Sequence, residues 1–211
     1  MKLRGALLLL AIPVLVLAGC ATPADPGEGG DIVPGGGGEP NPIAASGVVV
    51  GQGTVLQKDG EEAQFCLGPV AESYPPQCAG PQLLGLEWPD DGMWETASGV
   101  TWGTYAVSGS WDGETFTKGE MVIPLALYDP IRPEPDPRAD PANAGENSEQ
   151  LLLRVQDELS AWTEVTVLQS FPENGYLWAT VYYDDGTIQS YLDEIYGPDV
   201  VVVQSAFRDL P

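Results

Sequence analysis

The sequence contains three cysteines, Cys20, Cys66 and Cys78. The last two enclose a proline-rich stretch, CLGPVAESYPPQC at residues 66–78. Such a pair can be a redox couple, two ligands of a metal ion or a structural disulfide. A redox couple favours C-x-x-C spacing, and a metal ion needs at least two further ligands. The choice therefore depends on the other metal-binding residues and on the compartment in which the protein works.

The chain has no histidine. This absence excludes Ser-His-Asp and Cys-His catalysis, HExxH metalloproteases and histidine-based zinc sites. Carboxylates remain for acid-base chemistry, for example Glu114 with Glu120, but the carboxylate separation that decides glycosidase chemistry is a three-dimensional quantity. The sequence Asp-Asp-Gly occurs at residues 90–92 and 184–186. It is typical of turns, and neither copy begins a calcium-binding loop. We name no catalytic residue, metal ligand or cofactor.

The N-terminus has the layout of a secretory signal. Two basic residues precede an apolar run at residues 6–17, which is shorter than the about 20 residues of a transmembrane helix. LAGC at residues 17–20 resembles the lipobox of bacterial lipoproteins. The resemblance implies that residues 1–19 are a signal peptide and that Cys20 carries a diacylglycerol thioether. Two acyl chains suffice for stable anchoring, so we expect the protein at the extracytoplasmic face of the cell membrane.

With Cys20 assigned to lipid, Cys66 and Cys78 are the remaining thiols of an exported protein. Export to an oxidising compartment favours a structural disulfide between them. Closing a loop of this length contributes roughly 3 kcal/mol in the chain-entropy account.

The charge is strongly acidic. Without residues 1–19 the chain keeps 6 basic residues against 31 acidic ones, which gives a net charge of −25. Because nucleic-acid binding depends on Lys and Arg contacts to phosphates, we exclude it. The surplus favours solubility and attracts cations or basic partners.

Two stretches are rich in proline or glycine. Residues 20–46 lack apolar side chains for a core, and we interpret them as the lipidated Cys20 and a disordered tether. Residues 129–146 contain five prolines at 130, 133, 135, 137 and 141. Since proline lacks an amide hydrogen, we expect an extended connector there. The alternative is that this stretch wraps over one domain as an ordered strap.

Residues 47–128 predict an all-β domain. Asp59-Gly60 and Asp112-Gly113 each lie between β-prone runs, as in β-hairpins. Five or six short strands without a helix favour a small OB-like barrel, closed by the one disulfide.

Residues 147–211 predict an α-β-β-α-β domain, so the whole chain is expected to be α+β with two small domains. Asn147 followed by Gln150 is a capping arrangement for the first helix, and Gly197 is a suitable end for the second. The expected elements are helices at residues 146–162 and 187–197 and strands at 163–170, 176–183 and 199–207. The strand-helix-strand order predicts a three-stranded mixed sheet with both helices on one face.

Aromatic residues are the candidates for a binding surface. Four tryptophans lie in the β domain with Tyr105: Trp88, Trp94, Trp102 and Trp111. Tryptophans of small β domains usually form the core, and we expect Trp111, next to the Asp-Gly turn, to be the most exposed. Tyr74 in the disulfide loop is the second candidate.

The stretches CLGPVAESYPPQC, GPQLLGLEW and GVTWGTYAVSGSWDGETFT resemble a group of uncharacterised actinobacterial membrane lipoproteins over residues 47–117. The resemblance implies a cell-envelope location and a disulfide-closed β domain, and it implies no activity. We expect a non-enzymatic module that binds or organises an envelope protein or wall component. The alternatives are a carboxylate-dependent hydrolase of cell-wall glycan and an inhibitor or chaperone-like role of the C-terminal domain.

Overall fold

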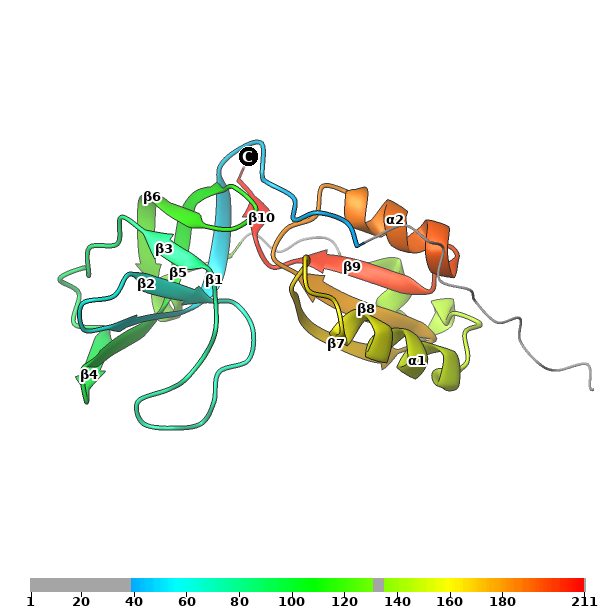
Figure 1. Ribbon diagram of the computed structural model, residues 1–211, viewed down its shortest axis with the longest axis horizontal. Coiled ribbons are helices and arrows are strands. Elements are labelled where there is room, and N and C mark those ends of the chain that lie inside the picture. The colour runs from blue at the N-terminus through cyan, green and yellow to red at the C-terminus, as the bar shows by residue number, and fades with distance from the viewer. Residues whose placement is uncertain (1–38, 131–134, 211) are drawn as a thin grey trace, which may run out of the picture. The chain divides into compact units, whose positions relative to one another are not determined.

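The computed structural model describes residues 39–130 and 135–210, which all belong to one compact unit of the chain (Figure 1). The expected signal peptide, Cys20 and most of the expected tether lie outside the described residues. Within the described ranges, no helix has the length and apolar character to cross a membrane. The fold is mixed α+β, with a seven-stranded sheet and a separate three-stranded sheet.

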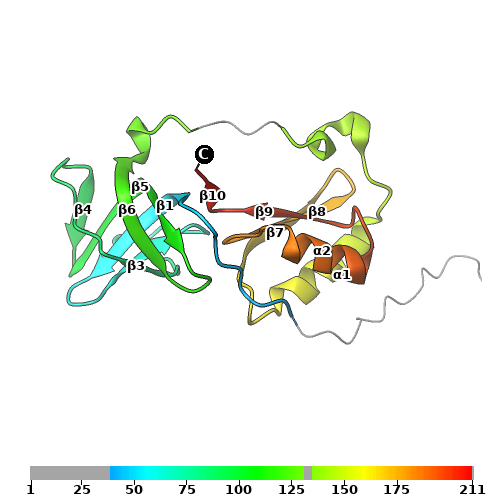
Figure 2. The same cartoon turned by 90° about the horizontal axis from the view of Figure 1, so that it is seen from above.

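The larger sheet combines the β-rich part of the chain with a C-terminal strand. Its strands are β1 (Val49–Lys58), β2 (Ala63–Cys66), β3 (Gln82–Leu84), β4 (Trp94–Ala97), β5 (Val100–Trp111), β6 (Phe116–Pro124) and β10 (Arg208–Asp209). The order is β10-β1-β2-β3-β6-β5-β4, and β1 also pairs with β5. Only β3 and β6 are parallel among these pairs. β10 lies beside β1, and β4 forms an edge next to β5 (Figure 2).

Both Asp-Gly hairpins are confirmed. Asp59-Gly60 connects β1 to β2, and Asp112-Gly113 connects β5 to β6. A third hairpin, between β4 and β5, turns at Ser98 and Gly99, which both have positive φ. The short 3₁₀ helix η1 (Leu125–Leu127) follows β6.

The core of the larger sheet is aromatic. Phe65 of β2, Phe116 of β6 and Phe207, which lies between β9 and β10, are fully buried and in mutual ring contact. A Cβ on Gly51 would come within 2.7 Å of Phe65 and 2.8 Å of Phe207. Glycine at this position of β1 therefore leaves space for the two rings.

The smaller sheet has the predicted order. Its elements are α1 (Glu149–Ser160), β7 (Val167–Glu173), β8 (Tyr176–Val181), α2 (Thr187–Tyr196) and β9 (Val201–Ser205). β7 and β8 are antiparallel, whereas β8 and β9 are parallel. Buried residues of both helices share one core with Leu177 and Ala179 of β8, so both helices cover the same face (Figure 1). The mixed three-stranded sheet is thus confirmed.

The N-cap of α1 differs from the expected one. Ser148, not Asn147, caps the helix, because its Oγ accepts a hydrogen bond from the Leu151 amide. Asn147 instead donates its side-chain amide to the carbonyls of Gly175 and Asp199. The expected end of α2 is confirmed, since Gly197 follows the helix with a φ of 94°.

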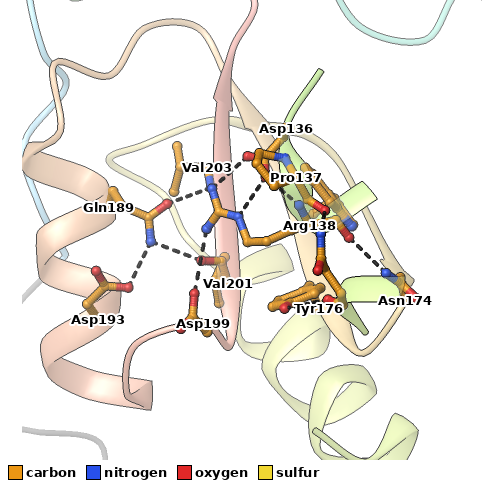
Figure 3. A network of polar contacts seen from close by, with 12 residues as sticks. Asp136, Pro137, Arg138, Asn174, Tyr176, Gln189, Asp193, Asp199, Val201 and Val203 are labelled. Carbon is orange, nitrogen blue, oxygen red and sulfur yellow. Dashed lines mark hydrogen bonds and ion pairs between the residues drawn. The ribbon is translucent and has the colours of Figure 1, made fainter. Parts of the chain in front are cut away.

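Two glutamines cover the outer edges of the smaller sheet. On the β9 edge, Gln189 of α2 donates to the Val201 carbonyl and accepts from the Val203 amide, both at 2.9 Å (Figure 3). On the β7 edge, Gln156 of α1 donates to the Ser170 carbonyl. Each helix therefore supplies a side chain that pairs with backbone groups an edge strand leaves open.

Residues 135–145 form an ordered strap. We had expected an extended connector here and had named the strap as the alternative. The strap contains two 3₁₀ turns, η2 (Pro137–Ala139) and η3 (Pro141–Asn143). Each turn begins with an Asp-Pro pair in which the carboxylate caps the turn, as Asp136 and Asp140 do. Proline at the first position loses no hydrogen bond there, which explains why a proline-rich stretch is ordered.

Side chains attach the strap to the turn between β7 and β8. Asn174 donates to the carbonyls of Arg138 and Asp140, and the Tyr176 hydroxyl donates to the Asn143 carbonyl. Arg138 forms a two-pronged ion pair with Asp136 and lies 3.9 Å from a carboxylate oxygen of Asp199 (Figure 3). The hydrogen bonds from Arg138 hold the pKa of Asp136 below its usual value.

Candidate functional site

A cavity of about 560 Å³ lies where the ends of the two sheets meet. It is lined by Pro42, Ile43, Ala79, Gly80, Pro81, Trp111, Gly113, Glu114, Glu164, Val165, Thr166, Val181, Tyr182, Tyr183 and Ile188. Its volume lies within the about 300–1,000 Å³ typical of small-molecule sites. The site therefore has the size of a ligand pocket.

The walls come from segments that are far apart in the sequence. Ile43 belongs to residues 39–46, which we expected to be disordered tether, and it packs against the cores of both sheets. Ala79 follows the disulfide loop, Val181 ends β8 and Ile188 begins the buried face of α2. The inner surface is mixed, with more apolar than polar area, and its apolar part continues the two cores outward.

Trp111 is buried, not exposed as we expected: it is 3 % accessible. Trp111 and the inward-facing Tyr105 are an even number of positions apart on β5, so their side chains point to the same face of the sheet. Residues 42–45 cover Trp111. Its indole N–H donates to the Ile43 carbonyl at 2.8 Å, and its own carbonyl accepts from the Ala45 amide. The ring contacts Tyr182 with centroids 5.3 Å apart. Trp111 is therefore a wall of the cavity and not a surface platform.

Two carboxylates, Glu114 and Glu164, lie at the mouth of the cavity; we call them the rim carboxylates. Both are exposed. Glu114 lies in the β5–β6 turn, where Asp112 accepts hydrogen bonds from the amides of Glu114 and Thr115. These bonds, with the one from the Thr115 hydroxyl, hold the pKa of Asp112 below its usual value. The turn is thus ordered by its own capping aspartate.

Glu164 lies in the loop between α1 and β7. The carboxylate of Glu39 accepts hydrogen bonds from the amides of Thr163 and Glu164, both at 2.7 Å. Neither Lys nor Arg lines the cavity. Both rim carboxylates are therefore held on ordered loops without a basic partner inside the cavity.

Two tyrosines at the end of β8 complete the wall. Burial raises the pKa of Tyr182. Burial also raises the pKa of Tyr183, and so does its hydrogen bond to Asp209 of β10 at 3.1 Å. Both phenols are protonated at neutral pH, so the wall carries hydroxyl groups and no anionic ring.

The predicted disulfide between Cys66 and Cys78 is confirmed, with Cα atoms 6.0 Å apart. The loop that it closes presents Tyr74, which is 73 % exposed. The Tyr74 ring meets Trp102 edge-on at 5.2 Å, and its hydroxyl donates to Glu95 at 3.3 Å. Tyr74 does not line the cavity. The two aromatic residues that we predicted for a binding surface are therefore not part of one site.

The other aromatic residues of the β domain divide between core and surface. Tyr105 is buried, and its hydroxyl donates to Asp91 at 3.3 Å. Trp88 packs against the core and donates to the Gln57 side chain, whereas Trp94 is 39 % exposed. The predicted aromatic core is confirmed for Tyr105 and does not extend to Trp94, whereas Trp111, which we expected to be exposed, belongs to it.

Of the two carboxylates that we considered as a glycosidase pair, Glu114 lines the cavity. Glu120 is an exposed residue of β6 and does not line the cavity. In the described ranges, no group of three or more Cys, Asp or Glu side chains is placed to hold a metal ion. No sequence pattern indicated Glu164 or Tyr182, although Ile43 was an apolar residue in an otherwise Gly/Pro-rich stretch.

Comparison of the chain with protein-family models, curated proteins and solved structures finds no match. The function is therefore argued from the site.

Proposed function

We propose that the protein is a lipid-anchored binding protein at the extracytoplasmic face of the cell membrane, and that its cavity holds a small ligand. The observation that carries the binding role is the cavity of about 560 Å³, whose lining combines apolar side chains with a few polar ones, as in small-molecule sites. The lipobox-like LAGC at residues 17–20 supports the anchor, and a disulfide suits an oxidising compartment.

We also propose that five strands of the larger sheet form an OB-like barrel. Support comes from the pairings, which run from β1 through β2, β3, β6 and β5 and return to β1. A strand number of five is that of the OB type. The acidic surface opposes the nucleic-acid binding that this fold often performs. The resemblance to actinobacterial lipoproteins over residues 47–117 supports the same envelope role.

Hydrolysis of wall glycan is the weaker proposal. A glycosidase keeps its general acid protonated by placing it in an apolar environment and sets a second carboxylate across the scissile bond. Glu114 and Glu164 are both exposed, and Glu120 is not part of the cavity. The arrangement fits electrostatic attraction of a ligand better than acid catalysis.

The anchor is tested by Cys20→Ala in the native cell. We expect the variant to leave the membrane fraction for the medium, because the diacylglycerol chains are lost. The control is Cys66→Ser/Cys78→Ser, which retains the lipobox and should stay with the membrane. Membrane retention of Cys20→Ala would contradict the anchor.

The binding role is tested with a neutral aromatic probe, 2-naphthylmethanol, on the full chain in the Cys20→Ala background. Calorimetry should show saturable binding. Ala79→Trp places a large side chain at the exposed mouth of the cavity and should abolish it, while Leu127→Trp, at an exposed site outside the cavity, should not. Binding that survives Ala79→Trp in a folded protein would show that the probe occupies another place and would contradict the assignment.

A further inference from the structure

We infer that the ligand of the cavity is a small organic cation, an amine carried on an apolar body, with the amine at Glu114 and Glu164 and the body against Ile43, Trp111 and Ile188. This inference rests on the proposed binding function and specifies its ligand class.

The charge around the cavity selects a cation. The five basic side chains of the described ranges are Lys58, Lys118, Arg138, Arg154 and Arg208, and none of them lines the cavity. The rim carboxylates therefore have no internal counter-ion there, and the net charge of the chain, −23, adds to the negative potential. Such a potential concentrates cations at the mouth and repels anions.

The number of ligand groups argues against a metal ion. Calcium takes about 6–8 oxygen ligands, and magnesium requires near-octahedral geometry. The two rim carboxylates have no third carboxylate or thiolate beside them that completes a metal-binding group in the described part of the chain. An ammonium group needs fewer partners, because even one carboxylate together with water satisfies its three donors.

The apolar walls require that the cation carry an apolar body. Ile43, Val165 and Ile188 are buried or partly buried side chains whose outer atoms line the cavity. The Trp111 and Tyr182 rings lie beside them, 5.3 Å apart. An inorganic ion or a polyamine would leave this surface wet, whereas an aryl or alkyl amine covers it.

The test compares three probes of one shape on the full chain in the Cys20→Ala background: 2-naphthylmethylamine, 2-naphthylmethanol and 2-naphthoate. We expect the amine to bind about tenfold more tightly than the alcohol, because two exposed carboxylates contribute modestly each. The naphthoate should bind most weakly. The advantage of the amine should shrink at high ionic strength, since exposed charges are screened.

Glu114→Gln/Glu164→Gln should reduce the affinity for the amine to that for the alcohol and leave the affinity for the alcohol unchanged. The matched control is Glu120→Gln, at an exposed carboxylate outside the cavity. It should change neither the affinity for the amine nor the affinity for the alcohol. If the alcohol and the amine bind equally to the parent chain, or if the double variant keeps the preference, the cation inference is wrong and the binding function stands. If none of the three probes binds, the proposed binding function itself fails.

Discussion

The ring of Phe207 stacks on the ring of Phe116, with centroids 4.7 Å apart and planes inclined by 14°. Phe116 begins β6 of the larger sheet, whereas Phe207 follows β9 of the smaller one. The smaller sheet therefore leads directly into the core of the larger sheet, and β10 then pairs with β1. The two sheets are therefore connected by the packing of the Phe207 side chain as well as by the polypeptide chain.

Phe207→Ala should lower the free energy of unfolding by about 3–5 kcal/mol, because it removes a fully buried aromatic ring. Urea unfolding followed by circular dichroism measures the loss. Leu127→Ala, at a side chain that is 72 % exposed, should change stability by less than about 0.5 kcal/mol. If Phe207→Ala costs less than about 1 kcal/mol, Phe207 does not contribute to the core as described.

The disulfide should protect the thiols of Cys66 and Cys78 from modification. Thiol trapping followed by mass spectrometry should find Cys66 and Cys78 unreactive until a reductant is added. Cys66→Ser/Cys78→Ser should lower the free energy of unfolding by roughly 3 kcal/mol, since the unfolded chain regains the freedom of the open loop. The reduced parent protein should show a similar loss. Equal stability of the oxidised and reduced forms would contradict a stabilising role.

Gln189→Ala should open the β9 edge of the smaller sheet. The variant leaves the Val203 amide and the Val201 carbonyl without their side-chain partner, and we expect a loss of about 1–3 kcal/mol. Hydrogen exchange at the Val203 amide should become faster. Gln204→Ala, at an exposed glutamine of β9 itself, is the matched control and should leave both quantities unchanged. Similar effects of both substitutions would contradict the specific pairing.

The protein should lose stability in alkali through Tyr105. Burial, with the nearby Asp91 carboxylate, raises its pKa to about 12, while an unfolded tyrosine ionises near about 10. Between these values the unfolded chain releases a proton that the folded protein retains, so the free energy of unfolding falls as pH rises. Tyr105→Phe should make the fall between pH about 10 and about 12 shallower. An unchanged slope in urea unfolding at several pH values would contradict this contribution.

Local patterns predicted much of the fold. Asp59-Gly60 and Asp112-Gly113 mark hairpins because their backbone preferences act within four residues. Gly197 likewise marks the end of α2 through its own backbone preference. The strap also has a local signal, Asp-Pro repeated at residues 136 and 140, which we did not use when we set the extended connector before the ordered strap.

The site was not predictable in the same way. Trp111 is buried because Ile43 and Ala45 cover it, and nothing near Trp111 in the sequence indicates that cover. The cavity is lined by Glu114 of the β5–β6 turn and by Glu164 of the loop before β7, and this shared lining depends on long-range packing. The position of Phe207 also depends on long-range packing, because its neighbours in the sequence belong to the smaller sheet.

The position of Phe207 also sets an order of folding. The residues that complete the core of the larger sheet follow the whole smaller sheet in the chain. During synthesis the first sheet therefore cannot reach its final packing until the second has been made, unlike separate domains that fold in turn from the N-terminus. If the chain crosses a membrane as we propose, the larger sheet would complete its core only after Phe207 has reached the far side.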